Sequence, residues 1–120
     1  KSRWKEIKSE NGPAMRHSHS AVIHNNGMFI FGGFSSKINF SDLHRFDFGT
    51  GYPLHFIRLL AILSFPGTEK WEAISTGAST GRRDHCAAVL GDFMIIHGGQ
   101  SQEFPLADFR LFSFGKFSLP

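Results

Sequence analysis

Residues 16–33, RHSHSAVIHNNGMFIFGG, and residues 82–99, RRDHCAAVLGDFMIIHGG, are two versions of one sequence pattern. The similarity continues to residues 48 and 114 without a gap, at an offset of 66 residues, and 11 of the 33 aligned positions are identical. Trp4 and Trp71 open two further similar segments, WKEI and WEAI. Repeats with such a period indicate a stacked array or a propeller, because one unit cannot bury its own core alone.

The apolar runs of the repeats are short, and glycine or polar clusters bound them, which predicts β-strands. Side chains of a strand alternate between two faces, and residues 28–31 (MFIF) are apolar on both. Each sheet is therefore expected to lie between two neighbours, as a propeller blade does. The Gly-Gly pairs at 32–33 and 98–99 are expected to end the second strand of each sheet with positive φ.

The motif R-x-x-H-(S/C)-A, followed by M-(F/I)-I-x-G-G, D-(L/F)-x-x-F-x-F and W, resembles the Kelch repeat, one blade of a β-propeller. The resemblance implies an all-β fold: a partial Kelch β-propeller of four-stranded antiparallel blades. Residues 1–10 would be the outer strand of a preceding blade, residues 11–75 a Kelch repeat with a hydrophobic insert at 51–67, and residues 76–120 a second, truncated repeat. Because a propeller holds about four to eight blades, further Kelch repeats or self-association are needed to close the ring.

The insert at 51–67, GYPLHFIRLLAILSFPG, lengthens the first repeat beyond the usual Kelch unit of about 50 residues. It is too short to span a bilayer, which takes roughly 20 apolar residues. Three interpretations stay open: a short helix packed on the propeller rim or on a partner, a translated non-coding segment, and an anchor on a membrane surface.

Composition describes a soluble globular chain, with 41% hydrophobic and 19% charged residues and no signal peptide pattern. The single Cys86 excludes a disulfide framework and favours a reducing, cytoplasmic location. The formal charge of +3 is mildly basic, but no RNA-binding aromatic motif or recognition helix accompanies it. We therefore expect no nucleic acid and no membrane among the partners.

Candidate chemistry is sparse. His17 and His19 form an H-x-H pair that zinc could use, yet only His19 recurs, as His85. A recurring histidine is expected to satisfy backbone groups near the propeller axis, so we predict no metal and no cofactor. Cys86 aligns with Ser20 and is expected to pack, not to attack a substrate. Some Kelch-type propellers are copper oxidases, but the site that this resemblance implies needs two tyrosines, and this chain has one. We predict no catalytic residue.

Two pairs of residues recur together: Arg16 with Asp42, and Arg82 with Asp108. Recurrence in both repeats argues for architecture over function. The arginine and aspartate are expected to pair between strands or between blades.

Loops that differ between the repeats are the candidate binding surface. Connections in an antiparallel blade alternate between its two ends, so residues 11–17, 34–41, 76–84 and 100–107 are expected to emerge together. The predicted partner-binding residues in these loops are His17, Phe34, Lys37, Asn39, Arg83, Gln100 and Glu103.

The resemblance implies a protein-protein interaction module that recruits a substrate to a ubiquitin ligase or scaffolds a signalling complex. The alternative is a Kelch segment appended to an enzyme whose catalytic residues lie outside this chain.

Overall fold

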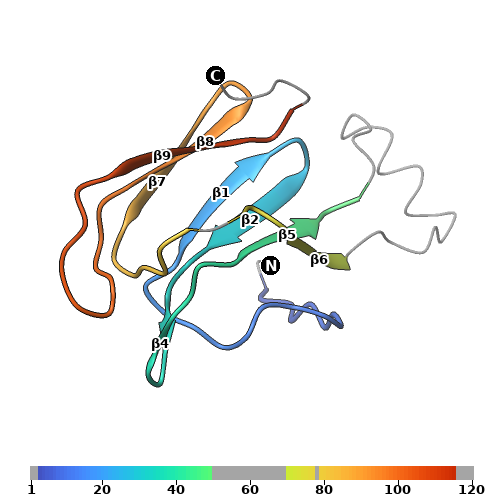
Figure 1. The fold of residues 1–120 in the computed structure, drawn as a ribbon. Helices are drawn as coiled ribbons and strands as arrows, with labels where there is room; N and C mark the ends of the chain where they lie inside the picture. The colour runs from blue at the N-terminus through green and yellow to red at the C-terminus, as the bar shows by residue number, and fades with distance from the viewer. Residues whose placement is uncertain (1–2, 50–69, 78, 116–120) are drawn as a thin grey trace, which may run out of the picture.

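The computed structural model of the protein describes residues 3–49, 70–77 and 79–115, and every regular element among them is a β-strand. The first sheet has the order β1 (Ser20–His24), β2 (Gly27–Phe31), β5 (Leu43–Asp47), β6 (Lys70–Ile74), and neighbouring strands are antiparallel. The second sheet has the order β7 (Cys86–Leu90), β8 (Phe93–His97), β9 (Phe109–Ser113), also antiparallel. Strands β3 (Phe34–Ser35) and β4 (Ile38–Asn39) form a small hairpin between β2 and β5 (Figure 1). The predicted all-β, partial Kelch propeller is confirmed, and its first blade has the expected four strands.

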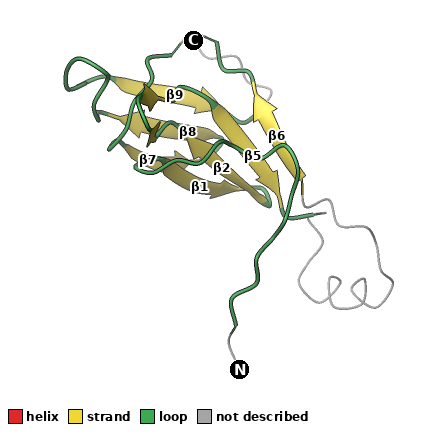
Figure 2. Cartoon of the chain, turned by 90° about the horizontal axis from the view of Figure 1, so that it is seen from below, coloured by secondary structure: helices red, strands yellow, loops and turns green. Residues whose placement is uncertain are grey.

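The two sheets pack face to face, with β1 beside β7 (Figures 1 and 2). Strand alternation turns Phe29 and Phe31 of β2 toward the second sheet and Ile30 toward the opposite face, and all three are buried. The core between the sheets consists of Val22, Phe29, Phe31 and Leu43 from the first sheet and Met94 and Ile96 from the second. Burying one such side chain stabilises the fold by roughly 1.5 to 3 kcal/mol, so this interface is a main source of stability.

On the opposite face of the first sheet, the tryptophan of the fourth strand packs against its neighbour in β5. The ring of Trp71 in β6 lies 5.1 Å from the ring of Phe46 in β5, edge to face, and Phe46 is buried. Trp71 therefore packs against the sheet of its own blade, as the position of tryptophan in each repeat predicts.

The main chain of Arg82 joins the two repeats. Its amide donates to the carbonyl of Phe40 (3.1 Å), and its carbonyl accepts from the amide of Gly33 (2.8 Å). Gly32 and Gly33 have φ of 64° and 96°, as predicted for the pair. A Cβ at Gly32 would lie 2.7 Å from the Arg82 carbonyl oxygen, so the glycine also makes room for the following repeat.

The side chain of each recurring arginine is held inside its own repeat. Arg82 is fully buried and donates to the Gly98 carbonyl (3.0 Å) and, through two nitrogens, to both carboxylate oxygens of Asp108 (2.6 and 2.8 Å). Arg16 bonds in the same way to Gly32 and Asp42. The predicted arginine-aspartate pairs thus form within each repeat. Hydrogen bonds from Arg82 and then from Arg110 hold the pKa of Asp108 well below its usual range.

The recurring histidine acts differently from what we expected. His85 Nε2 shares a hydrogen bond of 2.7 Å with the hydroxyl of Ser20 in the preceding repeat, and its Nδ1 is buried without a partner among the described residues. The partner of Nε2 is a side chain of the neighbouring strand and not a backbone group, because β1 and β7 lie side by side at the junction. Burial first, and the nearby Arg82 second, lower the pKa of His85 to about 4.

Three sequence predictions are left open by this architecture. Residues 3–10 form no strand and Trp4 is fully exposed; their role as an outer strand stays a prediction, because the described residues include no preceding sheet for them to join. The insert at 51–67 lies outside the described residues, so its three interpretations stay open. The proposed repeat boundary at residue 75 falls in the connection between β6 and β7 and also stays a prediction.

Candidate functional site

Four loop segments meet at one end of the two sheets. The β3–β4 hairpin and the loop between β8 and β9 project from this end (Figure 1). Isolated bridges tie His17 to Phe34 in the first repeat and Arg83 to Gln100 in the second, so each loop is anchored to the segment that enters its own inner strand. We call the surface formed by residues 17, 34–39, 83 and 100–104 the loop surface.

Arg83 is the centre of the loop surface and connects the two repeats. Its guanidinium carbon lies 4.7 Å from the centre of the Phe34 ring, a cation-π arrangement. One terminal nitrogen donates to Asn39 Oδ1 (3.1 Å) and the other to Gln100 Oε1 (3.2 Å). The ring of His17 meets Phe34 edge to face at 5.5 Å. Five of the seven predicted residues are thus in one continuous set of contacts.

The other two predicted residues, Lys37 and Glu103, line a groove beside this cluster. The groove has a volume of about 460 Å³ and lies between the β3–β4 hairpin and residues 101–104. A hydrogen bond of 3.1 Å from Asn39 Nδ2 to Gln102 Oε1 links its two walls. Asn39 belongs to both the groove and the Arg83 cluster, so the structure brings all seven predicted residues together.

Two apolar residues of the groove were not predicted. Ile38 and Phe104 line it, and each is 59% exposed. They occupy equivalent positions, 66 residues apart, on loops that contribute nothing to the core. An apolar residue recurring at the same place in two otherwise divergent loops is the sequence signal that could have identified them.

Local hydrogen bonds shape the second wall of the groove. The Ser101 hydroxyl donates to the carbonyl of Phe104 (2.9 Å) and accepts from its amide (3.2 Å), and the Ser101 amide also donates to that carbonyl (3.0 Å). These bonds close a tight turn that displays Glu103 and Phe104. A loop organised in advance loses less conformational entropy when a partner binds.

The groove carries both signs of charge. Lys37 and Glu103 line opposite walls, and both side chains are exposed. Among the described residues, no group of three His, Cys, Asp or Glu side chains lies close enough together to hold a metal ion. This arrangement offers apolar contact, hydrogen bonds and opposite charges, which are the means by which proteins bind other proteins.

Within the described segments, no helix is long and apolar enough to cross a membrane.

Comparisons with known proteins agree with this architecture. Residues 1–118 match the family model described as the KLHDC2/KLHL20/DRC7 Kelch-repeats domain. The Kelch domain-containing protein 3 of Rattus norvegicus is 30% identical over 93 residues, and that of Homo sapiens is 32% identical over 91 residues. Each alignment covers 74% of this chain and 20% of the relative, so the chain spans about a fifth of the length of these curated relatives. The chain therefore belongs to the Kelch-repeat family.

Proposed function

We propose that the loop surface binds a protein partner and that the chain acts as a protein-interaction module of a Kelch propeller. The observation that carries the proposal is the contact of Arg83 from the second repeat with Phe34 and Asn39 from the first. This contact makes the divergent loops one surface across the junction of two blades. Membership of a family whose domains in general serve protein interaction supports the same function.

The groove indicates how the partner is bound. Ile38 and Phe104 on its two walls would contact an apolar side chain of the partner. Lys37 and Glu103 would pair with an acidic and a basic group that flank this side chain. Arg83 would contribute affinity as arginines in the centre of interfaces do, because its planar guanidinium stacks and donates at the same time.

The finer roles implied by the resemblance are recruitment of a substrate to a ubiquitin ligase and scaffolding of a signalling complex, and a cytoplasmic location goes with both. These roles are part of the proposal. The two roles require different domains beside the Kelch repeats, so the domains encoded by the parent gene would distinguish them.

A matched pair of charge reversals tests the proposal. Glu103→Lys changes the groove, and Asp92→Lys changes an exposed acidic residue in the turn between β7 and β8 at the opposite end. Partners captured by the wild-type protein are identified by mass spectrometry, and one purified partner is then titrated against each variant. We expect Glu103→Lys and Phe104→Ala each to weaken binding about tenfold, or 1.4 kcal/mol, while Asp92→Lys binds like the wild type. If the loop variants bind normally and Asp92→Lys loses binding, the proposal is wrong, because the binding site then lies at the opposite end of the blades.

A further inference from the structure

A second cavity lies at the other end of the blades, away from the loop surface. It has a volume of about 410 Å³ and is lined by residues of the first sheet and by the end of β9. Strand β1 begins near the loop surface at Ser20 and ends at His24, which lines the cavity together with Phe114 beyond β9. We call this cavity the end pocket.

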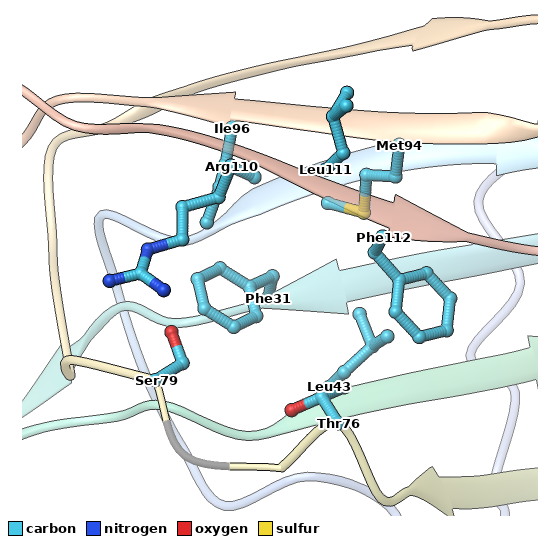
Figure 3. Close-up of a pocket in the computed structure, with 9 residues that line it drawn as sticks. All are labelled: Phe31, Leu43, Thr76, Ser79, Met94, Ile96, Arg110, Leu111 and Phe112. Atoms are coloured by element: carbon cyan, nitrogen blue, oxygen red, sulfur yellow. The ribbon is translucent and has the colours of Figure 1, made fainter. Parts of the chain in front are cut away.

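The end pocket differs from the hollow in the middle of the interface between the sheets. That hollow has a volume of about 130 Å³, and Phe31, Leu43 and Phe112 lie around it (Figure 3). Pockets that hold organic ligands usually have volumes of roughly 300 Å³ or more. By this measure the end pocket is large enough for a small organic molecule and the hollow is not.

Aromatic rings from both sheets form one wall of the end pocket. The ring of Phe114 stacks on His24, with 4.1 Å between ring centres and 12° between planes. It also contacts the rings of Phe29 (4.5 Å) and Phe112 (5.7 Å). The amide of Phe114 donates to the carbonyl of Asp92 (2.8 Å), which fixes the backbone that carries the ring. A flat apolar molecule can pack on such a wall.

Arg45 brings a positive charge to this apolar surroundings. It shares a strand face with Leu43 of the core, and its equivalent in the second repeat is Leu111. The neighbouring strand makes room for it with Gly27, where a Cβ would lie 2.5 Å from Arg45 Nε, and the second repeat has Phe93 at that position. The arginine and the glycine are thus a matched departure from the repeat pattern, and recurrence does not explain them.

The guanidinium of Arg45 has hydrogen-bond donors that its neighbours do not use. Its side chain is only 24% exposed, and it forms an ion pair with Asp47 (3.3 Å from Nη1) and a hydrogen bond to the Asn25 carbonyl (3.5 Å from Nη2). A guanidinium carries more N–H donors than these two contacts occupy. Its Nε in particular has no acceptor among the described residues. An acceptor oxygen in the end pocket would satisfy donors that are largely withdrawn from water.

Glu72 places an acceptor beside these donors. It lies directly opposite Arg45 in the register of β5 and β6, and such cross-strand neighbours are about 5 Å apart at Cβ. Both residues line the end pocket, yet among the described residues Arg45 pairs with Asp47 and not with Glu72. The pocket therefore presents a donor and an acceptor side by side. A carboxamide matches this pair, because its oxygen accepts and its N–H donates.

We propose that the end pocket binds an uncharged organic molecule that has a flat apolar body and an amide group. The body packs on the rings of Phe29, Phe112 and Phe114, the amide oxygen accepts from Arg45, and the amide N–H donates to Glu72. A ligand with a net charge of either sign is disfavoured, because a carboxylate would meet Glu72 and an ammonium would meet Arg45.

Three small probes test this preference on the full chain. Phenylacetamide, phenylacetate and phenethylamine all carry one aromatic ring, and they differ in being neutral, anionic and cationic. Each is titrated in ligand-observed NMR, which measures weak dissociation constants. We expect phenylacetamide to bind the wild type with a dissociation constant on the order of 1 mM, as its size allows, and the two charged probes to bind about tenfold more weakly.

Two variants assign the binding to the two polar residues. Arg45→Leu, which introduces the residue of the second repeat, should weaken phenylacetamide about tenfold and strengthen phenethylamine, because the repelling cation is removed. Glu72→Gln should strengthen phenylacetate for the corresponding reason. Arg110→Leu is the matched control: it makes the same change at the smaller hollow and should bind all three probes like the wild type. Thermal melts followed by circular dichroism check the fold, and Glu72 is exposed, so its variant should melt like the wild type.

A wild type that binds none of the probes, or binds all three equally, would overturn the proposal. Unchanged affinities in both Arg45→Leu and Glu72→Gln would also overturn it, as would an equal loss in Arg110→Leu, because the probe would then occupy the smaller hollow. Glu103→Lys, which changes the loop surface, should leave the affinity for phenylacetamide unaltered. The outcome is therefore independent of the proposed function.

Discussion

The two sheets of this chain have nearly the same sequence pattern but very different burial. Leu43 of the first sheet is 2% exposed, and its equivalent Phe109 of the second is 65% exposed. Val22 is buried, and its equivalent Ala88 is exposed. The second sheet covers this face of the first sheet. No described residue covers the equivalent face of the second sheet. A Kelch repeat therefore supplies an apolar face, and the following repeat decides whether that face becomes core.

The arginine-aspartate pairs, unlike the apolar faces, are the same in both repeats. In both repeats the shortest nitrogen-oxygen distance of the pair is 2.6 Å, and the arginine also binds the carbonyl of the first glycine of the Gly-Gly pair. These contacts lie within a repeat, so they form with or without a neighbour. Interactions inside a blade and interactions between blades can thus be separated by mutation.

The largest expected effect is that of Arg82→Ala. The change removes the buried donor of the Asp108 carboxylate and of the Gly98 carbonyl, so that Asp108 keeps only the hydrogen bond from the more exposed Arg110 (2.8 Å), and it opens a cavity at the junction of the sheets. We expect a loss of about 3 to 5 kcal/mol in the free energy of unfolding, measured by urea denaturation. Arg16→Ala is the matched control and should cost less, roughly 1 to 3 kcal/mol, because Asp42 is more open to water. Equal losses in the two variants would mean that burial at the junction adds nothing to the stabilisation by the Arg82–Asp108 pair.

A smaller but sharper contrast is expected between Leu43→Ala and Phe109→Ala. Leu43 fills the core between the sheets, so its truncation should cost about 2 to 4 kcal/mol. Phe109→Ala should change the free energy of unfolding by less than about 0.5 kcal/mol at a concentration where the chain is monomeric. A large loss for Phe109→Ala under that condition would show that its face is already covered within one chain.

The smallest expected effect is the acid sensitivity of the junction through His85. Its pKa is lowered to about 4 in the folded protein, first by burial and then by Arg82, against an ordinary value of 6.5. The unfolded chain therefore binds more protons between pH 6.5 and 4, and the folded state loses stability as the pH falls through this window. The ring is only about half buried, so the loss should be on the order of 1 to 2 kcal/mol.

Urea titrations at a series of pH values measure this loss. His85→Gln should remove the dependence on pH within the window. His19→Gln should leave most of it in place, because His19 lowers the pKa of His85 less than burial and Arg82 do. An unchanged dependence in His85→Gln would assign the acid sensitivity to other groups.

Several features of the candidate site were accessible from the sequence, and others were not. Divergence between aligned loops identified His17, Phe34 and Arg83, because anchored loops of repeated blades emerge at the same end. The groove between Ile38 and Phe104 was missed, since an isolated apolar loop residue looks like any other surface residue. Likewise, the partner of His85 could not be predicted, because Ser20 lies 65 residues earlier and only the packing of β7 beside β1 brings them together.

The amino-acid sequence by itself determined the strands of the two sheets, the position of Gly32 and Gly33, the pairing of the recurring arginines with the recurring aspartates, and the end of the blades where the variable loops gather. These features depend on strand alternation, on glycine's access to positive φ, and on contacts that recur with the repeat. Only the tertiary structure decided which apolar face is buried, which carbonyl Gly33 binds, and that Arg83 reaches Phe34 and Asn39. These depend on how one sheet stacks on the next, and stacking brings together residues whose separation along the chain carries no local signal.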